Sequence, residues 1–464
     1  MTISLRTSFD SLADRLTGDV ITPDHPEYET ARRVWNEMID RRPAVMARCA
    51  NAEDVAAAVG FARACGLTIA VRGGGHNVAG TAVVDDGIVI DLSPMRAVRI
   101  DDSHDTVHVE GGATWGDVDV VTQPFGLATP GGVVSQTGVA GLALSGGVSF
   151  QRRAHGMTID NMVSAEMVLA DGQRVRASAD ENSDLFWAIR GGGGNFGIVT
   201  SFELRLHELG PDVFALNVAY PLDEAERVIA AWRDAVADAP DELSTHGYIW
   251  TMPVAPELPE HLRGRPFIGV GGMYAGDPEE GERVTCPLRA LGTPLLDTSG
   301  TVPYVDLQQS YDVFFPAGLR YYWKALYLDG FGDAAISQTT QWSRERPSPR
   351  TLVIIRHVGG AVARVEPEAT AFGDRSSEWM LSIDSTWDNP ADDERNIGWT
   401  RAYWDDALRY SDGKTYFNFP GLFEEGQRAI RASYGRNADR LAQVKAGYDP
   451  DNLFRLNQNI RPAR

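Results

Sequence analysis

The stretch that decides the fold is Val71–Gly80, VRGGGHNVAG, in which three consecutive glycines separate an apolar run from His76. Glycine backbone can turn its N–H groups toward one point and let an anion approach closely, so Gly73–Gly75 predict a nest for a pyrophosphate. The segment has neither the Gly-Lys-Ser/Thr of a P-loop nor the GxGxxG spacing. A tight turn is the competing explanation for the glycines, and His76 at the edge of the turn favours contact with a bound cofactor.

The residues before this stretch predict a parallel strand–helix–strand unit. Ala44–Ala47 and Leu67–Val71 are short apolar runs. Between them, Asn51 is suited to cap a helix whose first turn carries acidic residues that oppose the helix dipole, and Gly66 is suited to end it. Two strands joined by one helix are expected to lie parallel in the same sheet.

Two local signals follow the glycine-rich stretch. Thr114 and Asp117 have the spacing of a capping box, which predicts the start of a helix. Asp171-Gly172 lies between the strand-like runs Met162–Ala170 and Gln173–Arg176, and an Asp-Gly pair favours a primed hairpin turn.

Five blocks rich in glycine or asparagine occur along most of the chain. Each block alone is explained by tight turns, but five in a fixed order are far more specific. In this order they resemble the berberine bridge enzyme-like flavoproteins, a branch of the vanillyl-alcohol oxidase and p-cresol methylhydroxylase superfamily. The blocks are VRGGGHNVAG (71–80), PGG with TGVAGLALSGG (130–132 and 137–147), GMTIDN (156–161), GGGGNFGIVT (191–200) and YDPDNLFRLNQNI (448–460).

The resemblance implies an α+β fold, in which a two-part FAD-binding domain of the p-cresol methylhydroxylase type carries an inserted antiparallel-sheet substrate domain. It assigns residues 1–206 and 410–464 to the FAD-binding domain and residues 207–409 to the substrate domain. In the family the histidine that matches His76 is bonded to the flavin, which implies covalent FAD here. The residues expected to contact the cofactor are Arg72, Gly73, Gly74, Gly75, His76, Asn77, Gly132, Thr137, Gly138, Gly141, Val199 and Asn418.

One position departs from the pattern. Many members of the family attach FAD a second time through a cysteine in the second glycine-rich block, and the matching residue here is Val134. Valine cannot form a thioether. We therefore predict a single covalent bond, through His76, as in the bacterial 6-hydroxynicotine oxidase type.

The middle of the chain predicts strands with one face toward a ligand. In Trp379–Trp387, apolar side chains alternate with Met380, Ser382 and Asp384, so one face is expected to pack against helices and the other to cover a cofactor. Asp384 is interpreted first as a solvated or hydrogen-bonded residue and second as an inward carboxylate. The aromatic cluster Tyr321–Trp323 is interpreted as core before pocket.

Tyr416 is the candidate catalytic base. It lies in Thr415–Pro420, TYFNFP, which resembles the family motif Tyr-x-Asn-Tyr/His, and in related members the first tyrosine helps to remove a proton. Alternation along a strand would place Tyr416 and Asn418 on one side. A free tyrosine has a pKa near 10, so a base needs a nearby cation or dipole; Lys324 and Lys414 are candidates for this role, and the sequence does not decide for either.

The predicted function is that of an FAD-dependent oxidoreductase of the oxidase type that takes a hydride from a C–H bond of a small alcohol, sugar or amine onto flavin N5. Molecular oxygen or another acceptor would reoxidise the flavin. An oxidative cyclase or a dehydrogenase of secondary metabolism would use the same cofactor residues. A non-catalytic metabolite binder on the same fold is the alternative from another class.

Composition excludes several classes of partner. A net charge of −21, from 64 acidic and 43 basic residues, opposes binding to nucleic acid or to an anionic membrane. The chain has no signal-like leader and no run of about eighteen apolar residues, so we expect a cytoplasmic protein. Its three cysteines lack CxxC spacing and no HExxH pattern occurs, so free thiols and no metal site are expected.

Overall fold

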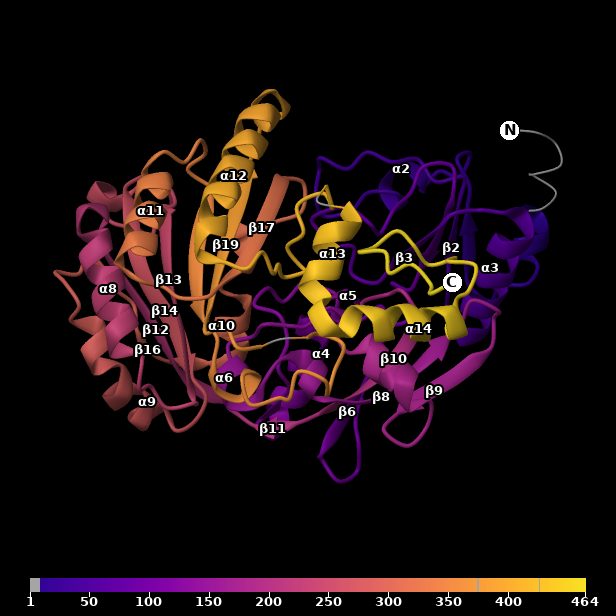
Figure 1. Cartoon of the computed structure of the whole chain (residues 1–464), viewed down its shortest axis with the longest axis horizontal. Coiled ribbons are helices and arrows are strands. Elements are labelled where there is room, and N and C mark those ends of the chain that lie inside the picture. Colours follow the sequence, from indigo (N-terminus) through magenta and orange to yellow (C-terminus); the bar gives the residue numbers. More distant parts are fainter. Residues whose placement is uncertain (1–8, 374, 425) are drawn as a thin grey trace.

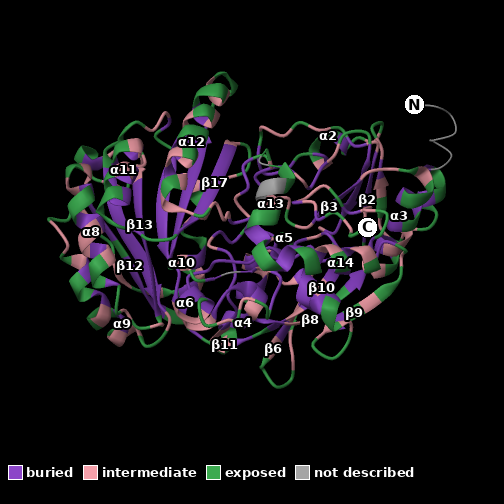
Figure 2. Ribbon diagram, in the orientation of Figure 1, coloured by how far each residue is buried: buried purple, intermediate pink, exposed green. Residues whose placement is uncertain are grey.

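The computed structural model describes residues 9–373, 375–424 and 426–464. Figure 1 shows two halves side by side: a large sheet with its helices on the left, and two smaller sheets with the C-terminal helices on the right. The architecture is α+β, as the resemblance implied. Figure 2 shows that the long strands of the large sheet are buried, whereas β9 (Arg174–Ser178) and the outer helices keep exposed faces.

The first sheet contains the predicted parallel unit. Its strands lie in the order β1-β2-β4-β3, and β4 pairs in parallel with both β2 and β3, so it separates the two strands of the unit. The connecting helix α3 begins where Asn51 accepts a hydrogen bond from the Asp54 N–H, and it ends at Gly66 with a φ of 65°. The elements are β1 (Asp19–Ile21), α2 (Tyr28–Ala31), β2 (Val45–Arg48), α3 (Ala52–Cys65), β3 (Ile69–Arg72) and β4 (Ile88–Asp91).

The second sheet is antiparallel, in the order β5-β6-β10-β8-β9. The capping box at Thr114 and Asp117 is present and starts α4. The elements of this region are β5 (Val98–Ile100), β6 (Thr106–Glu110), α4 (Trp115–Thr122), β7 (Leu127–Ala128), α5 (Val139–Leu144), α6 (Arg152–His155), β8 (Met162–Val168), β9 (Arg174–Ser178), α7 (Ser183–Ile189), β10 (Ile198–Arg205) and β11 (His207–Glu208).

The β8–β9 hairpin forms, but its turn is not the predicted primed type. Leu169 and Gln173 face each other, and the Gly172 N–H donates to the Leu169 carbonyl across a three-residue loop. Gly172 has a φ of 86°, while Asp171 is not among the residues with positive φ. A type I turn followed by a left-handed glycine closes the hairpin, and only the glycine needs the unusual backbone conformation.

The large antiparallel sheet follows the order β15-β12-β14-β13-β18-β19-β17, with β16 paired to β12. Four helices, α8, α9, α11 and α12, cover its outer side (Figure 1). The elements are β12 (Asp212–Pro221), α8 (Ala225–Ala235), β13 (Leu243–Thr251), β14 (Pro266–Tyr274), α9 (Pro278–Thr285), β15 (Leu296–Asp297), β16 (Gly300–Pro303), α10 (Tyr304–Gln309), β17 (Arg320–Leu328), α11 (Asp333–Arg344), β18 (Leu352–His357), β19 (Trp379–Trp387) and α12 (Asp393–Ala407).

The two faces of this sheet differ as the alternation in β19 predicts. Leu381 and Ile383 pack in a core with Trp232 of α8 and Tyr403 of α12. Asp384, on the opposite face, lines a cavity between the two halves. Period-two alternation thus divides one strand between a helix-covered core and a ligand site.

The C-terminal segment returns to the first half. Helices α13 (Gly426–Tyr434) and α14 (Ala438–Tyr448) follow the large sheet in sequence, yet Leu441 and Val444 of α14 share a core with Trp187 and Phe196. Burial of this apolar face holds the end of the chain against the half that contains the glycine-rich loops. In the described part of the chain, no helix has both the length and the apolar character needed to span a bilayer.

Candidate active site

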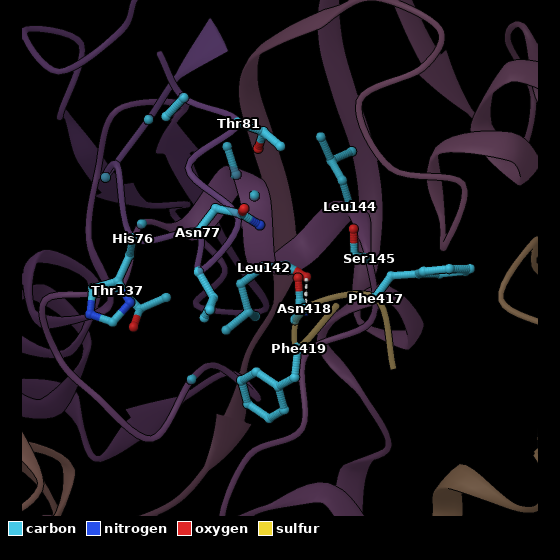
Figure 3. A pocket seen from close by; sticks show the side chains of 18 of the residues that line it. His76, Asn77, Thr81, Thr137, Leu142, Leu144, Ser145, Phe417, Asn418 and Phe419 are labelled. Carbon is cyan, nitrogen blue, oxygen red and sulfur yellow. Dashed lines mark hydrogen bonds between the residues drawn. The ribbon is translucent and has the colours of Figure 1, made fainter. Parts of the chain in front are cut away.

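A deep cavity lies between the glycine-rich loops of the first half and the inner face of the large sheet. Every predicted site residue except Arg72 lines it, and the lining also includes Val134. Figure 3 shows His76 beside Thr137 in one part of the cavity wall, and Asn418 and Phe419 in another part. Segments far apart in the sequence therefore meet around one space.

Arg72 has a different place from the one predicted for it. Its side chain is buried, and its guanidinium donates to the carbonyl of Ala31 and lies 3.9 Å from the Asp91 carboxylate. Arg72 is therefore not part of the cavity lining. Its contacts with Ala31 and Asp91 hold the start of the glycine-rich loop in place.

The glycines of two loops are needed for different reasons. A Cβ on Gly74 would lie 2.5 Å from the backbone N of Gly138, and a Cβ on Gly138 would lie 2.4 Å from the N of Gly74. These two loops therefore touch through bare backbone. Gly75 alone of the three consecutive glycines has a positive φ, 66°. At Gly141 an added Cβ would meet no protein atom within 4 Å, so the cavity wall there is open to a ligand.

His76 is held as a neutral imidazole at the cavity wall. Its ring stacks on Trp35, with centroids 4.1 Å apart, and Trp35 in turn stacks on Tyr321. Burial lowers the pKa of His76 to about 4. Among the residues that the structure describes, none forms a hydrogen bond with its buried Nε2. A neutral ring with an unmatched nitrogen, beside a bare-backbone loop, fits a flavin cofactor.

Tyr416 has a phenol oxygen that accepts two hydrogen bonds. The Gly147 N–H and the Asn418 side-chain amide each donate to it over 2.9 Å. Burial raises the pKa of Tyr416, while these donors and the nearby Arg356 guanidinium act in the opposite direction. Both donors stabilise the phenolate, so the arrangement suits a group that takes and returns a proton.

The local backbone around Tyr416 differs from the predicted strand. The Phe419 N–H donates to the Tyr416 carbonyl, so these residues form a tight turn, and the turn brings Asn418 against the phenol. The expected lysine partners are held elsewhere: Lys324 lies 3.8 Å from Glu424, and Lys414 lies 2.5 Å from Asp412. The cation that acts on the phenol is Arg356, which the sequence did not single out.

Several residues of the cavity wall come from the large sheet. Burial raises the pKa of Asp384 to about 6, and the carboxylate accepts a hydrogen bond from Ser382; it is both inward and hydrogen-bonded. Trp323 lines the cavity, whereas Tyr321 is fully buried. A single charged residue, Arg356, within the apolar strand LVIIRH (352–357) was the signal that sequence reasoning missed.

Comparison with known proteins agrees with this geometry. A family model for an FAD binding domain matches residues 43–178, and a model described as berberine and berberine like matches residues 415–461. The first match contains the glycine-rich loop with His76, and the second contains Tyr416. The two models therefore cover the glycine-rich loop and the C-terminal segment of the cavity wall, and the large sheet lies between the two matches in sequence.

Relatives extend the match to nearly the whole chain. The (R)-6-hydroxynicotine oxidase of Paenarthrobacter nicotinovorans is 31% identical, with 96% of this chain and 97% of the relative covered. The crystal structure of 6-hydroxy-D-nicotine oxidase from Arthrobacter nicotinovorans has a TM-score of 0.87 at 28% identity, covering 97% and 98% of the two chains.

A solved structure with a doubly attached flavin has the same fold. Glucooligosaccharide oxidase from Acremonium strictum, whose FAD is linked to a cysteinyl and a histidyl group, has a TM-score of 0.86 at 23% identity, covering 98% and 99%. This likeness shows a common fold over nearly the whole length of both chains. The chain belongs to the berberine bridge enzyme-like FAD-linked oxidoreductases of the p-cresol methylhydroxylase superfamily.

Proposed function

We propose that the chain binds FAD covalently through His76 alone and oxidises a C–H bond of a small alcohol, sugar or amine, with Tyr416 as the base. The observation that carries this proposal is that His76 and Tyr416, from the two ends of the sequence, line one cavity. When bound, FAD supplies a hydride acceptor at N5. The proposed boundaries of the FAD-binding and substrate domains remain 1–206, 207–409 and 410–464.

His76 supplies the attachment because it is neutral and already fixed in place. Its lowered pKa leaves a lone pair free at neutral pH, and the stack on Trp35 limits rotation of the ring. Val134 lines the same cavity but offers no nucleophile. We therefore expect one covalent bond to FAD, through His76, and none at position 134.

Tyr416 supplies the base for a substrate O–H or N–H. Its oxygen is held by the Gly147 N–H and the Asn418 amide, so the phenolate would keep two donors after it loses its proton. Charged acceptors form stronger hydrogen bonds than neutral ones, so both donors stabilise the phenolate that acts as the base.

The covalent bond is tested by acid denaturation followed by flavin fluorescence in a gel. Wild-type protein should keep its fluorescent band, and His76→Ala should lose it while still binding FAD in the native state. The double variant His76→Ala/Val134→Cys should recover the band, because a thiolate at position 134 faces the same cavity. A fluorescent band in His76→Ala alone would contradict the proposal.

The base is tested by anaerobic stopped-flow reduction of the flavin across a panel of alcohols, sugars and cyclic amines. Tyr416→Phe should slow reduction tenfold or more, since a general base usually contributes a factor of about 10²–10⁴ to the rate. Tyr403→Phe is the matched control, since Tyr403 is a buried tyrosine in the helix-covered core. An unchanged reduction rate in Tyr416→Phe would remove this residue from the mechanism.

A further inference from the structure

Arg356 presents an unmatched donor to the cavity. It lies on β18, is 7% exposed and lines the cavity wall. Within residues 9–373, 375–424 and 426–464, its Nη1 atom is buried and has no hydrogen-bond partner, and its side chain forms no ion pair. Nearly all buried polar groups in proteins are paired. An exception that borders a ligand cavity therefore points to an acceptor on the ligand.

The neighbouring Arg152 differs from Arg356 because its donors are occupied. Arg152 also lines the cavity, but its Nε and Nη1 donate to the carbonyls of His357 and Ser149 over 2.9 Å. Its Nη2 donates to the Thr245 carbonyl. Arg152 thus adds positive charge to the wall but holds the backbone in place, and Arg356 keeps free donors.

The groups that face Arg356 leave this part of the wall positive. Asp384 is the carboxylate that acts on it, and that carboxylate accepts its hydrogen bond from Ser382. Tyr311 and Tyr416 also face it, and burial raises the pKa of both phenols. Burial keeps His246 neutral, since it lowers the pKa of that ring, and Tyr327 has a raised pKa. Two guanidinium groups therefore face one carboxylate.

We propose that Arg356 binds an anionic oxygen of the substrate, and that the substrate class is a small molecule bearing a carboxylate. The inference rests on the proposed function, because it assumes that the substrate enters this cavity. A guanidinium offers planar, paired donors that match the geometry of a carboxylate. Arg356 is buried, so its attraction for an anion is screened less than that of a surface arginine.

The test compares two ligands of almost equal shape, benzoate and benzamide, by isothermal titration calorimetry of the holoprotein. Benzoate should bind at least about tenfold more tightly than benzamide, because a hydrogen bond to a charged group contributes more than a neutral one. Arg356→Met should reduce this preference to near one. Arg350→Met is the control, since Arg350 is an exposed arginine whose partner is Asp388, and it should keep the wild-type preference.

Equal affinities for benzoate and benzamide in the wild type, or an unchanged preference in Arg356→Met, would overturn the inference. If Arg356→Met does not fold, Arg356→Gln is used instead, because it keeps a polar side chain without the charge. It should likewise reduce the preference for benzoate over benzamide to near one. Flavin bleaching distinguishes the two proposals. If neutral substrates bleach the flavin but benzoate does not bind more tightly than benzamide, only the inference about Arg356 is wrong. If benzoate binds more tightly but no substrate bleaches the flavin, only the proposed oxidation is wrong.

Discussion

At the scale of single residues, burial sets the protonation states on which the cavity depends. His76 and Asp384 move in opposite directions because burial disfavours the charged form of each. The pKa of His76 falls to about 4, which leaves a neutral ring, and that of Asp384 rises to about 6. Both shifts follow from where the tertiary structure puts these side chains, since neither residue is adjacent to a charged residue in the sequence.

Asp384 should make the stability of the protein depend on pH. Its folded pKa of about 6 exceeds the ordinary value of 3.8, so its contribution is fully present below pH 3.8 and is lost as the pH rises through about 6. Asp384→Asn should therefore gain stability relative to the wild type between pH 4 and pH 8, by on the order of 3 kcal/mol. Urea unfolding of the holoprotein at several pH values measures this change.

The matched control for Asp384→Asn is Asp388→Asn. Asp388→Asn changes an exposed aspartate on the same domain, whose side chain is 64% exposed. The difference in unfolding free energy between Asp384→Asn and wild type should grow with pH. Asp388→Asn measures the effect of removing a surface carboxylate from the same domain. A difference for Asp384→Asn that is independent of pH would contradict the raised pKa.

At the scale of elements, the contact between two glycine loops holds the cofactor side of the cavity together. Gly74 follows β3, and Gly138 immediately precedes α5. Neither position tolerates a Cβ, because the backbone of one loop occupies the place where the side chain of the other would go. The sequence indicated that glycines were needed here, and the structure gives the packing reason.

Gly138→Ala should push these loops apart, lower the melting temperature and reduce flavin content. Gly60→Ala is the matched control: Gly60 lies inside α3, and an added Cβ there meets no protein atom within 4 Å. Alanine at a helix interior should stabilise the protein by about 0.5–1 kcal/mol relative to glycine. Thermal unfolding and the absorbance of bound flavin measure both effects, and an unchanged Gly138→Ala protein would show that the loops can separate freely.

At the scale of the whole molecule, surface charge and cavity charge have opposite signs. The net charge of −21 repels an anionic substrate in solution, whereas the cavity wall around Arg356 attracts it at short range. Salt screens exposed charges over about 10 Å at 0.1 M but affects buried groups much less. The association rate of an anionic substrate should therefore depend on salt concentration more strongly than its interaction with Arg356 in the cavity.

The association rate of benzoate should rise as NaCl increases from about 20 to about 200 mM, because screening weakens repulsion by the acidic surface. The rate for benzamide, which is uncharged, should stay nearly constant and is the control. Stopped-flow absorbance of the bound flavin measures both rates. A benzoate rate that falls with salt would show that local positive charge, and not the net charge, governs the approach.

The sequence by itself determined the family, the fold class and the flavin cofactor, and it named a minority of the residues that line the cavity. It did so because glycine is needed where the backbone takes a left-handed conformation, as at Gly75, or meets other backbone closely, as at Gly74 and Gly138, and this need is visible in the sequence as glycine-rich blocks. Helix caps at Asn51 and Thr114 are also visible in the sequence, and both are present. The turn after Tyr416 and the packing of Arg72 depend on distant segments and were not predicted.

The tertiary structure alone decided which charges face the cavity. Arg356 and Asp384 lie on separate strands of the large sheet, and Tyr416 lies on the returning C-terminal segment. Their mutual effects arise from burial and from distances through space, which the order of residues along the chain does not encode. For this reason the sequence named two lysines as partners of Tyr416, and the fold supplied an arginine.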